Sequence, residues 1–339
     1  MAKSKKGSKG GYIVDCMQHS FPERARFEEW RKGGIGCVHI TLAIWEDARD
    51  TLKAIGKWNR LFEAHGDLIA QAESVADIER IAASGRTAVI FGFQNTSPFE
   101  DDIELVQIFH KLGVRVVQLT YNIQNNVATG CWEDHDAGVS KVFGRNVIAE
   151  MNRLGMMIDV SHCNERSCFD AIELSEKPVA ITHANPGEFV GTDIELKRRT
   201  KSTPLIKAMA KKNGVIGLSM YPRMMKGGSD NRLSTFCDMV CWTVDTIGAD
   251  HVGFGTDFYV GWPETEIVWW RAGRFARRSP LAISPKFADW PAWFRSPAGF
   301  PKAVEALSKR GFTSAELAKI TGGNWLRMFR QCWAPVKAK

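Results

Sequence analysis

Three residues of metal-ligand type stand at corresponding places in the sequence, each at the end of a short, nearly apolar run. His162 and His183 end two consecutive runs, and Asp257 ends the last run of this kind. Two neutral imidazoles and a carboxylate suit Zn²⁺, with an open position for a water whose pKa the metal lowers toward about 7. The three residues therefore predict a metal site with an activated water.

Other polar side chains follow the same pattern. In a parallel barrel the last residues of the strands converge on one pocket, so these positions predict its lining. They are His19, Gln94, Asn95, Tyr121, Asn122 and Tyr221. The remaining histidines have no such placement and are interpreted as structural or exposed: His39, His65, His110, His135 and His251.

The elements that must position these residues alternate regularly along the chain. The apolar runs predict strands at residues 12–18, 37–43, 87–95, 114–121, 156–162, 179–184, 215–221 and 252–258. Helical periodicity lies between them, for example at 102–112, 142–154, 165–174, 204–212 and 232–247. Eight strand–helix repeats predict an α/β fold, a (β/α)₈ TIM barrel. A doubly wound open sheet is the alternative, but no GxGxxG or Walker loop follows any strand.

Two stretches lie outside the eightfold repeat. Residues 46–75 predict a long amphipathic helix followed by a short extended piece. Residues 259–300 form a long insertion after the eighth strand, which holds five of the twelve tryptophans. This insertion leaves the barrel at the end where active sites of the fold lie. We expect it to cover the mouth, and a dimer contact is the alternative.

Composition and charge restrict the class of protein. The net charge of +7 includes six lysines at the two termini, and without them 39 basic residues face 38 acidic ones. We therefore predict basic tails at 1–11 and 334–339, one barrel at 12–333, and no nucleic-acid partner. No apolar run is long enough to span a bilayer, so no membrane role is expected. The eight scattered cysteines indicate reduced thiols in a cytoplasmic protein.

Several motifs in order resemble the membrane (renal) dipeptidase family of the amidohydrolase superfamily. They are DVSH at 159–162, PVAITH at 178–183, VGFGTDF at 252–258 and GGNWL at 322–326. The resemblance implies a TIM barrel, a metal site, hydrolysis of small peptides or related amides, and often a homodimer.

The resemblance also implies roles for particular residues. His162 and His183 match the histidines of the family's second metal. Asp257 matches an aspartate that ligates the first metal and handles the proton of the attacking water. Arg199 aligns with a substrate-binding arginine, and Tyr121 stands in place of a substrate-polarising histidine.

The sequence departs from the family at the first metal. Where the family has a histidine and an aspartate on the first strand, this chain has Met17 and His19, and Gln94 replaces the bridging glutamate. A neutral amide does not bridge two cations as a carboxylate does, and a thioether is a poor ligand for Zn²⁺. We therefore predict one Zn²⁺ on His162 and His183, completed by Asp257 or Gln94. His19 is either a second acid or base or fills the vacated ligand position.

Three functions fit these residues. The first is a mononuclear metal-dependent hydrolase of a C–N bond in a small carboxylated substrate, with Asp257 as general base. Here Arg199 holds an anionic group, and Tyr121, Asn122 and Tyr221 complete the substrate site. The second is a lyase or isomerase that reuses the pocket with a lost or altered metal centre. The third is a catalytically silent binding protein.

Overall fold

The computed structural model describes residues 11–273 and 288–335. Most of the two predicted tails, and part of the insertion after the eighth strand, lie outside these residues. Within the described ranges no helix is both long and apolar enough to cross a bilayer.

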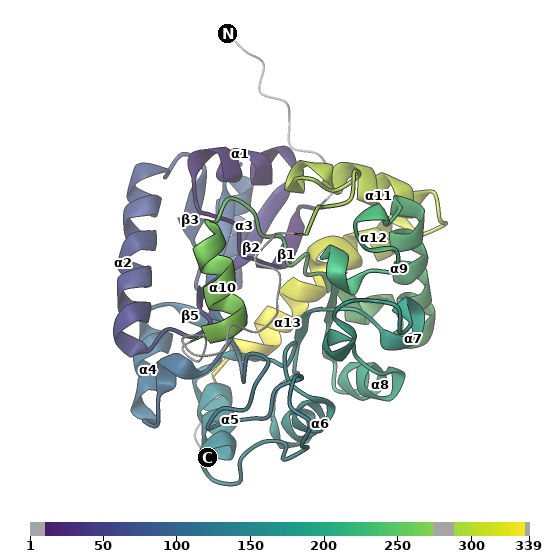
Figure 1. Cartoon of the computed structure of the whole chain (residues 1–339). Helices are drawn as coiled ribbons and strands as arrows, with labels where there is room; N and C mark the ends of the chain where they lie inside the picture. Colours follow the sequence, from purple (N-terminus) through teal and green to yellow (C-terminus); the bar gives the residue numbers. More distant parts are fainter. Residues whose placement is uncertain (1–10, 274–287, 336–339) are drawn as a thin grey trace.

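Parallel strands form the barrel predicted from the sequence (Figure 1). Their order is β6-β5-β4-β2-β1-β9-β8-β7, and the bridge between Asp159 and Ala180 joins β6 to β7. The ninth strand, β3, pairs only with β4 and corresponds to the short extended piece expected near residue 70. The strands are β1 Ile13–Gln18, β2 Ile35–Ala43, β3 Ile69–Gln71, β4 Thr87–Phe93, β5 Val114–Gln118, β6 Met157–Asp159, β7 Ile181–Ala184, β8 Ile216–Leu218 and β9 Val252–Phe254.

Helices surround the strands, as the periodicity predicts. They are α1 Arg24–Lys32, α2 Ala48–Ala64, α3 Val75–Ala83, α4 Glu104–Lys111, α5 Phe143–Leu154, α6 Glu165–Leu174, α7 Gly187–Val190, α8 Thr203–Lys211, α9 Leu233–Ile247, α10 Glu264–Ala272, α11 Phe300–Ser308, α12 Ser314–Ala318 and α13 Asn324–Cys332. Side-chain caps begin several of them: Asp47 accepts from the Asp50 amide at α2, and Asn164 accepts from the Ser167 amide at α6.

The GGNWL segment closes the amino-terminal end of the barrel. Asn324 donates to the Val252 carbonyl at 2.8 Å, and Trp325 Nε1 donates to the Phe254 carbonyl at 3.0 Å. A Cβ on Gly322 would lie 2.8 Å from the Tyr12 carbonyl oxygen, so this close approach requires glycine. The motif is therefore structural, and the opposite end of the barrel is left for the site.

Several strands end earlier than the apolar runs suggest. β5 ends at Gln118 and β6 at Asp159, each three residues before the predicted end. After β6, the amide and hydroxyl of Ser161 bond to the Asp159 side chain. The polar residues expected at strand ends therefore sit in the first turn of the following loops.

Candidate active site at the carboxyl ends of the strands

A cavity of about 510 Å³ opens at the carboxyl ends of the strands. It gathers most of the residues predicted from the sequence: His19, Gln94, Tyr121, Asn122, His162, Arg199, Tyr221 and Asp257. His183 is fully buried beside them and does not line the cavity itself, but its Nε2 atom contacts Nε2 of His162, which does. The eight strands thus bring together residues that are as much as 238 positions apart in the chain.

Hydrogen bonds fix the orientation and tautomer of His162. Its Nδ1 lies 2.6 Å from Asn122 Oδ1, and because an amide oxygen only accepts, Nδ1 carries the hydrogen. Asn122 holds this position with a left-handed φ of 62°, which asparagine tolerates better than most residues. Tyr121 stacks on the imidazole at 4.2 Å between ring centroids. The Nε2 of neutral His162 is consequently an unprotonated lone pair.

A chain of hydroxyls fixes His183 in the same way. Thr182 Oγ1 donates its one hydrogen to Asp159 Oδ2 at 2.7 Å, so it accepts from His183 Nδ1 at 2.8 Å. Asp159 also accepts from the amide and hydroxyl of Ser161 and from the Thr182 amide. Nε2 of His183 is therefore also a bare lone pair. Outer partners of this kind orient the histidines of metal sites.

The two bare nitrogens face each other at 3.0 Å. Burial and the neighbouring Arg199 hold the pKa of both imidazoles well below the usual range, so both are neutral. Arg199 Nη1 donates to His162 Nε2 at 2.8 Å, and Nη2 donates to the His183 carbonyl at 3.1 Å. The guanidinium thus supplies positive charge to lone pairs that otherwise repel.

Two neighbouring side chains at the cavity have the chemistry to hold a metal ion. The bare His162 and His183 nitrogens are suitable ligands, and an ion bound there would displace Arg199 Nη1 from His162. Within the described ranges, no three His, Cys, Asp or Glu side chains gather closely enough to hold a metal. Met17 is fully buried, with its sulfur accepting from Thr41, and does not line the cavity.

Asp257 is a buried carboxyl group in the cavity lining. Its φ is 55°, and its amide donates to the Met17 carbonyl at 3.1 Å. Neighbouring Thr256 is held by Asp15, which accepts from its amide and its hydroxyl. Burial raises the pKa of Asp257 to about 7, against the opposing effect of Arg199. A carboxyl with this pKa exchanges a proton near neutral pH.

His19 lies against the insertion. Its ring packs on Trp270 at 4.5 Å and on Trp262 at 5.3 Å between centroids, and Trp262 Nε1 donates to the His19 carbonyl. Burial lowers the pKa of His19 to about 3, so the ring is neutral at physiological pH. A neutral imidazole of such low basicity is a poor proton acceptor, which leaves Asp257 as the stronger base.

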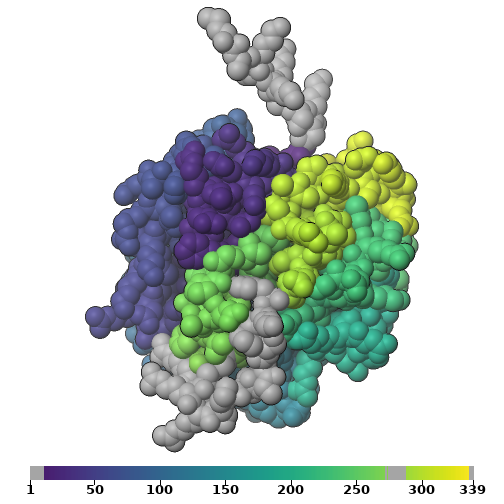
Figure 2. All heavy atoms as spheres, turned by 45° about the horizontal axis from the view of Figure 1, so that its top comes forward, coloured from purple at the N-terminus to yellow at the C-terminus, as the bar shows by residue number. Residues whose placement is uncertain are grey.

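Sequence reasoning placed the tryptophan-rich insertion over the barrel mouth but named none of its residues as site residues. Ile267, Trp270 and Arg271 all line the cavity. In Figure 1, α10 lies to the left of the centre of the view, and Figure 2 shows its green surface beside the purple amino-terminal segment. The cluster of tryptophans and arginines in the insertion was the sequence signal for this part of the site. The order of these residues does not indicate which of them face the cavity.

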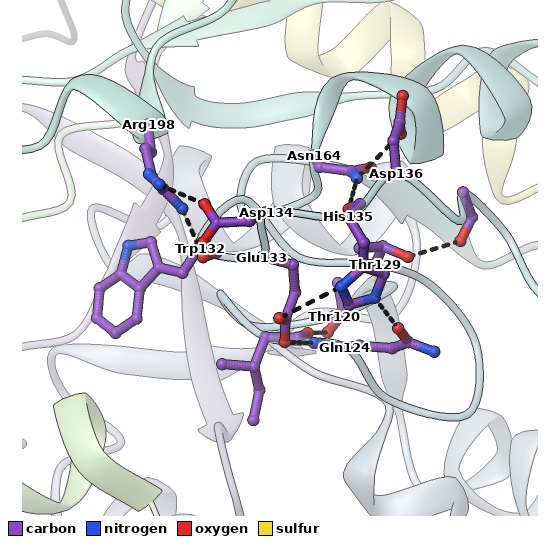
Figure 3. Close-up of polar contacts among 12 residues, drawn as sticks. Thr120, Gln124, Thr129, Trp132, Glu133, Asp134, His135, Asp136, Asn164 and Arg198 are labelled. Atoms are coloured by element: carbon purple, nitrogen blue, oxygen red, sulfur yellow. Dashed lines mark hydrogen bonds and ion pairs between the residues drawn. The ribbon is translucent and has the colours of Figure 1, made fainter.

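One rim of the cavity is a loop between β5 and α5, held by polar contacts (Figure 3). Arg198 donates to the Trp132 carbonyl and to Asp134, both at 2.6 Å. Glu133 accepts from the Gln124 amide at 2.8 Å. These bonds fix the backbone beside Trp132, whose side chain lines the cavity.

Comparison with known proteins agrees with this architecture. The family model of the membrane dipeptidases, peptidase family M19, matches residues 14–266. The chain is 27% identical over 289 residues to dipeptidase tcpJ of Claviceps purpurea, covering 84% of this chain and 60% of that protein. It is 24% identical over 321 residues to dipeptidase aclJ of Aspergillus oryzae, covering 89% and 68%. The chain thus spans about two thirds or less of the length of these fungal proteins.

Solved structures extend the comparison over the whole barrel. An amidohydrolase from Pseudomonas aeruginosa superposes with a TM-score of 0.89 at 33% identity, covering 95% of this chain and 96% of that one. Dipeptidase AC, a metallopeptidase of family M19, gives 0.78 at 18% identity, covering 95% and 98%. At 18% identity, dipeptidase AC shows that the two chains share a fold. The chain belongs to the membrane dipeptidase family, peptidase family M19.

Proposed function

We propose that this protein hydrolyses a C–N bond, a peptide or related amide, in a small substrate that carries a carboxylate. One metal ion, best matched by Zn²⁺, is held by His162 and His183, and Gln94 or Asp257 completes its shell. Such an ion polarises the substrate carbonyl or lowers the pKa of its water. The observation that carries the proposal is the pair of bare, oppositely placed Nε2 atoms, each fixed by an outer hydrogen bond.

Asp257 moves the proton in this scheme. Its carboxylate takes a proton from the attacking water as the water oxygen bonds to the carbonyl carbon, and returns it to the nitrogen that leaves. A pKa of about 7 suits both halves of this exchange. Tyr121 keeps its own proton, because burial and then Asp257 raise the pKa of the phenol, so it can donate a hydrogen bond to the substrate.

Two further parts of the proposal follow from the family and the composition. We propose that the protein forms a homodimer. Its molar mass, measured by light scattering during size-exclusion chromatography, tests this. We also propose a cytoplasmic location, with support from eight cysteines that are all free thiols, as expected in a reducing compartment. We place α10 at the substrate site, so a homodimer interface formed by α10 would contradict that part of the proposal.

Metal analysis and a dipeptide panel test the function together. We expect about one zinc per chain, turnover of at least one dipeptide, and loss of both metal and turnover in the His162→Ala, His183→Ala double variant. Asp257→Asn is expected to keep the metal and lower kcat by at least about 100-fold. Metal-free protein with full turnover would disprove the metal role. No dipeptide turnover, with Asp257→Asn still blocking a native reaction, would favour a lyase or isomerase.

A further inference from the structure

Arg271 places a cation in the cavity that the proposed chemistry does not use. It lies on α10 and lines the cavity. Among the described residues, its buried Nη1 atom has no hydrogen-bond partner. The phenol rings of Tyr121, Tyr221 and Tyr259 line the same cavity as Arg271. A buried donor without an acceptor is costly, so the site is built for an acceptor that arrives with a ligand.

Among the described residues, the cavity lining holds two other arginines, and each of them has a partner. Arg199 donates to the His183 carbonyl and, when no ion is bound to His162, also to His162 Nε2. Arg223 pairs with Glu195 at 2.5 Å. Among the described residues, Asp257 is the other acid in the lining, and the charge of Arg199 lowers its pKa against the effect of burial. The cavity therefore retains excess positive charge in the part that Arg271 occupies.

The backbone around Arg271 is held firmly in place. Trp45 Nε1 donates to the Trp270 carbonyl at 2.9 Å, and Trp269 Nε1 donates to Glu46 Oε1 at 3.1 Å. A Cβ on Gly273 would lie 3.0 Å from the Trp45 ring, so α10 ends in tight contact with the loop after β2. A helix anchored in this way to the loop after β2 presents Arg271 at a defined position, which specific recognition requires.

We propose that the substrate carries a second anionic group, an acidic side chain, and that Arg271 binds it as a specificity-determining residue. The substrate class is then a dicarboxylic amide, such as a dipeptide with a glutamyl or aspartyl residue. A guanidinium binds a carboxylate through two parallel hydrogen bonds and discriminates against the neutral amide of the same shape. This inference rests on the proposed amide hydrolysis for its reaction, and on the cavity alone for its ligand chemistry.

Matched dipeptides test the inference in the holoenzyme. Ala-Glu and Glu-Ala are compared with Ala-Gln and Gln-Ala, which differ only by charge. We expect kcat/KM to favour a glutamyl substrate by about 10- to 100-fold, and Arg271→Met to remove most of this preference through KM. Arg166→Met is the control, because Arg166 pairs with Asp170 outside the cavity lining, and it should keep the preference. Equal rates for Glu and Gln substrates would overturn the inference.

A binding measurement separates this inference from the reaction. Calorimetry compares glutarate, a dianion, with pentanoate, a monoanion of equal length. We expect Arg271→Met to weaken glutarate binding by about tenfold or more and to leave pentanoate unchanged. That result without any dipeptide turnover would uphold Arg271 and disprove the amide hydrolysis. Dipeptide turnover with glutarate binding unaffected by Arg271→Met would do the reverse.

Discussion

Asp257→Asn is expected to make the metal-free protein more stable at high pH while removing its activity. The carboxyl is buried with a pKa of about 7, against 3.8 in its ordinary state. A raised pKa in the folded state means that stability is full below about pH 4 and is lost as pH rises toward 7. At about 1.4 kcal/mol per pKa unit, the ionised carboxylate costs the fold about 4 kcal/mol above pH 7. Asparagine has the same shape, no charge, and tolerates the left-handed φ of 55°.

Urea denaturation with a chelator present measures this effect at pH 5, 6.5 and 8. The stability difference between Asp257→Asn and the wild type should grow by about 2–3 kcal/mol between pH 5 and pH 8. Asp134→Asn is the control, because that carboxylate is 89% exposed and should change stability by less than about 0.5 kcal/mol at each pH. A variant less stable than the wild type at pH 8, or a gain independent of pH, would refute the reasoning.

Three further predictions concern the same end of the barrel. Asp159→Asn frees the Thr182 hydroxyl to donate to His183, moves the imidazole hydrogen to Nε2, and should weaken zinc binding about 10- to 100-fold by calorimetry. Arg199→Met frees His162 Nε2 and should tighten zinc binding about tenfold, whereas Arg223→Met should leave the zinc affinity unchanged. Equal zinc affinities of Arg199→Met and the wild type would show that Arg199 does not compete with zinc for His162. Gly92→Ala places a Cβ 2.0 Å from His39 Nε2 and should cost about 1–3 kcal/mol in urea denaturation.

The sequence predicted the barrel well because its signals are local. An apolar run such as 114–121 indicates a buried strand whatever its neighbours are, and helical periodicity such as that at 165–174 indicates a helix. The positions of His162, His183 and Asp257 followed from the same runs. The three-residue error at the ends of β5 and β6 arose because side-chain hydrogen bonds, as at Ser161, replace the strand ladder there.

Features that depend on contacts between distant segments could not be predicted. The tautomer of His183 depends on Thr182 and Asp159, which meet only when β7 lies beside β6. The place of Arg271 depends on the bond between Trp45 and the Trp270 carbonyl, which joins residues 225 positions apart. Helical periodicity is weak evidence for the face of α10 that turns inward, because tryptophans lie on more than one side of it.

The charge of the cavity gives an independent reason to propose one metal ion rather than two. A binuclear centre needs several carboxylates to offset four positive charges, and here the first-strand position is a thioether, Met17, while Gln94 is a neutral amide. Asp257 alone cannot offset two ions beside Arg199 and Arg271, since repulsion between cations is strong where water is largely excluded. The triple variant Met17→His, His19→Asp, Gln94→Glu restores one imidazole and two carboxylates, and it should raise the zinc content from about one toward two ions per chain. Unchanged metal content, in a variant that keeps its circular dichroism, would show that charge does not set the number of ions.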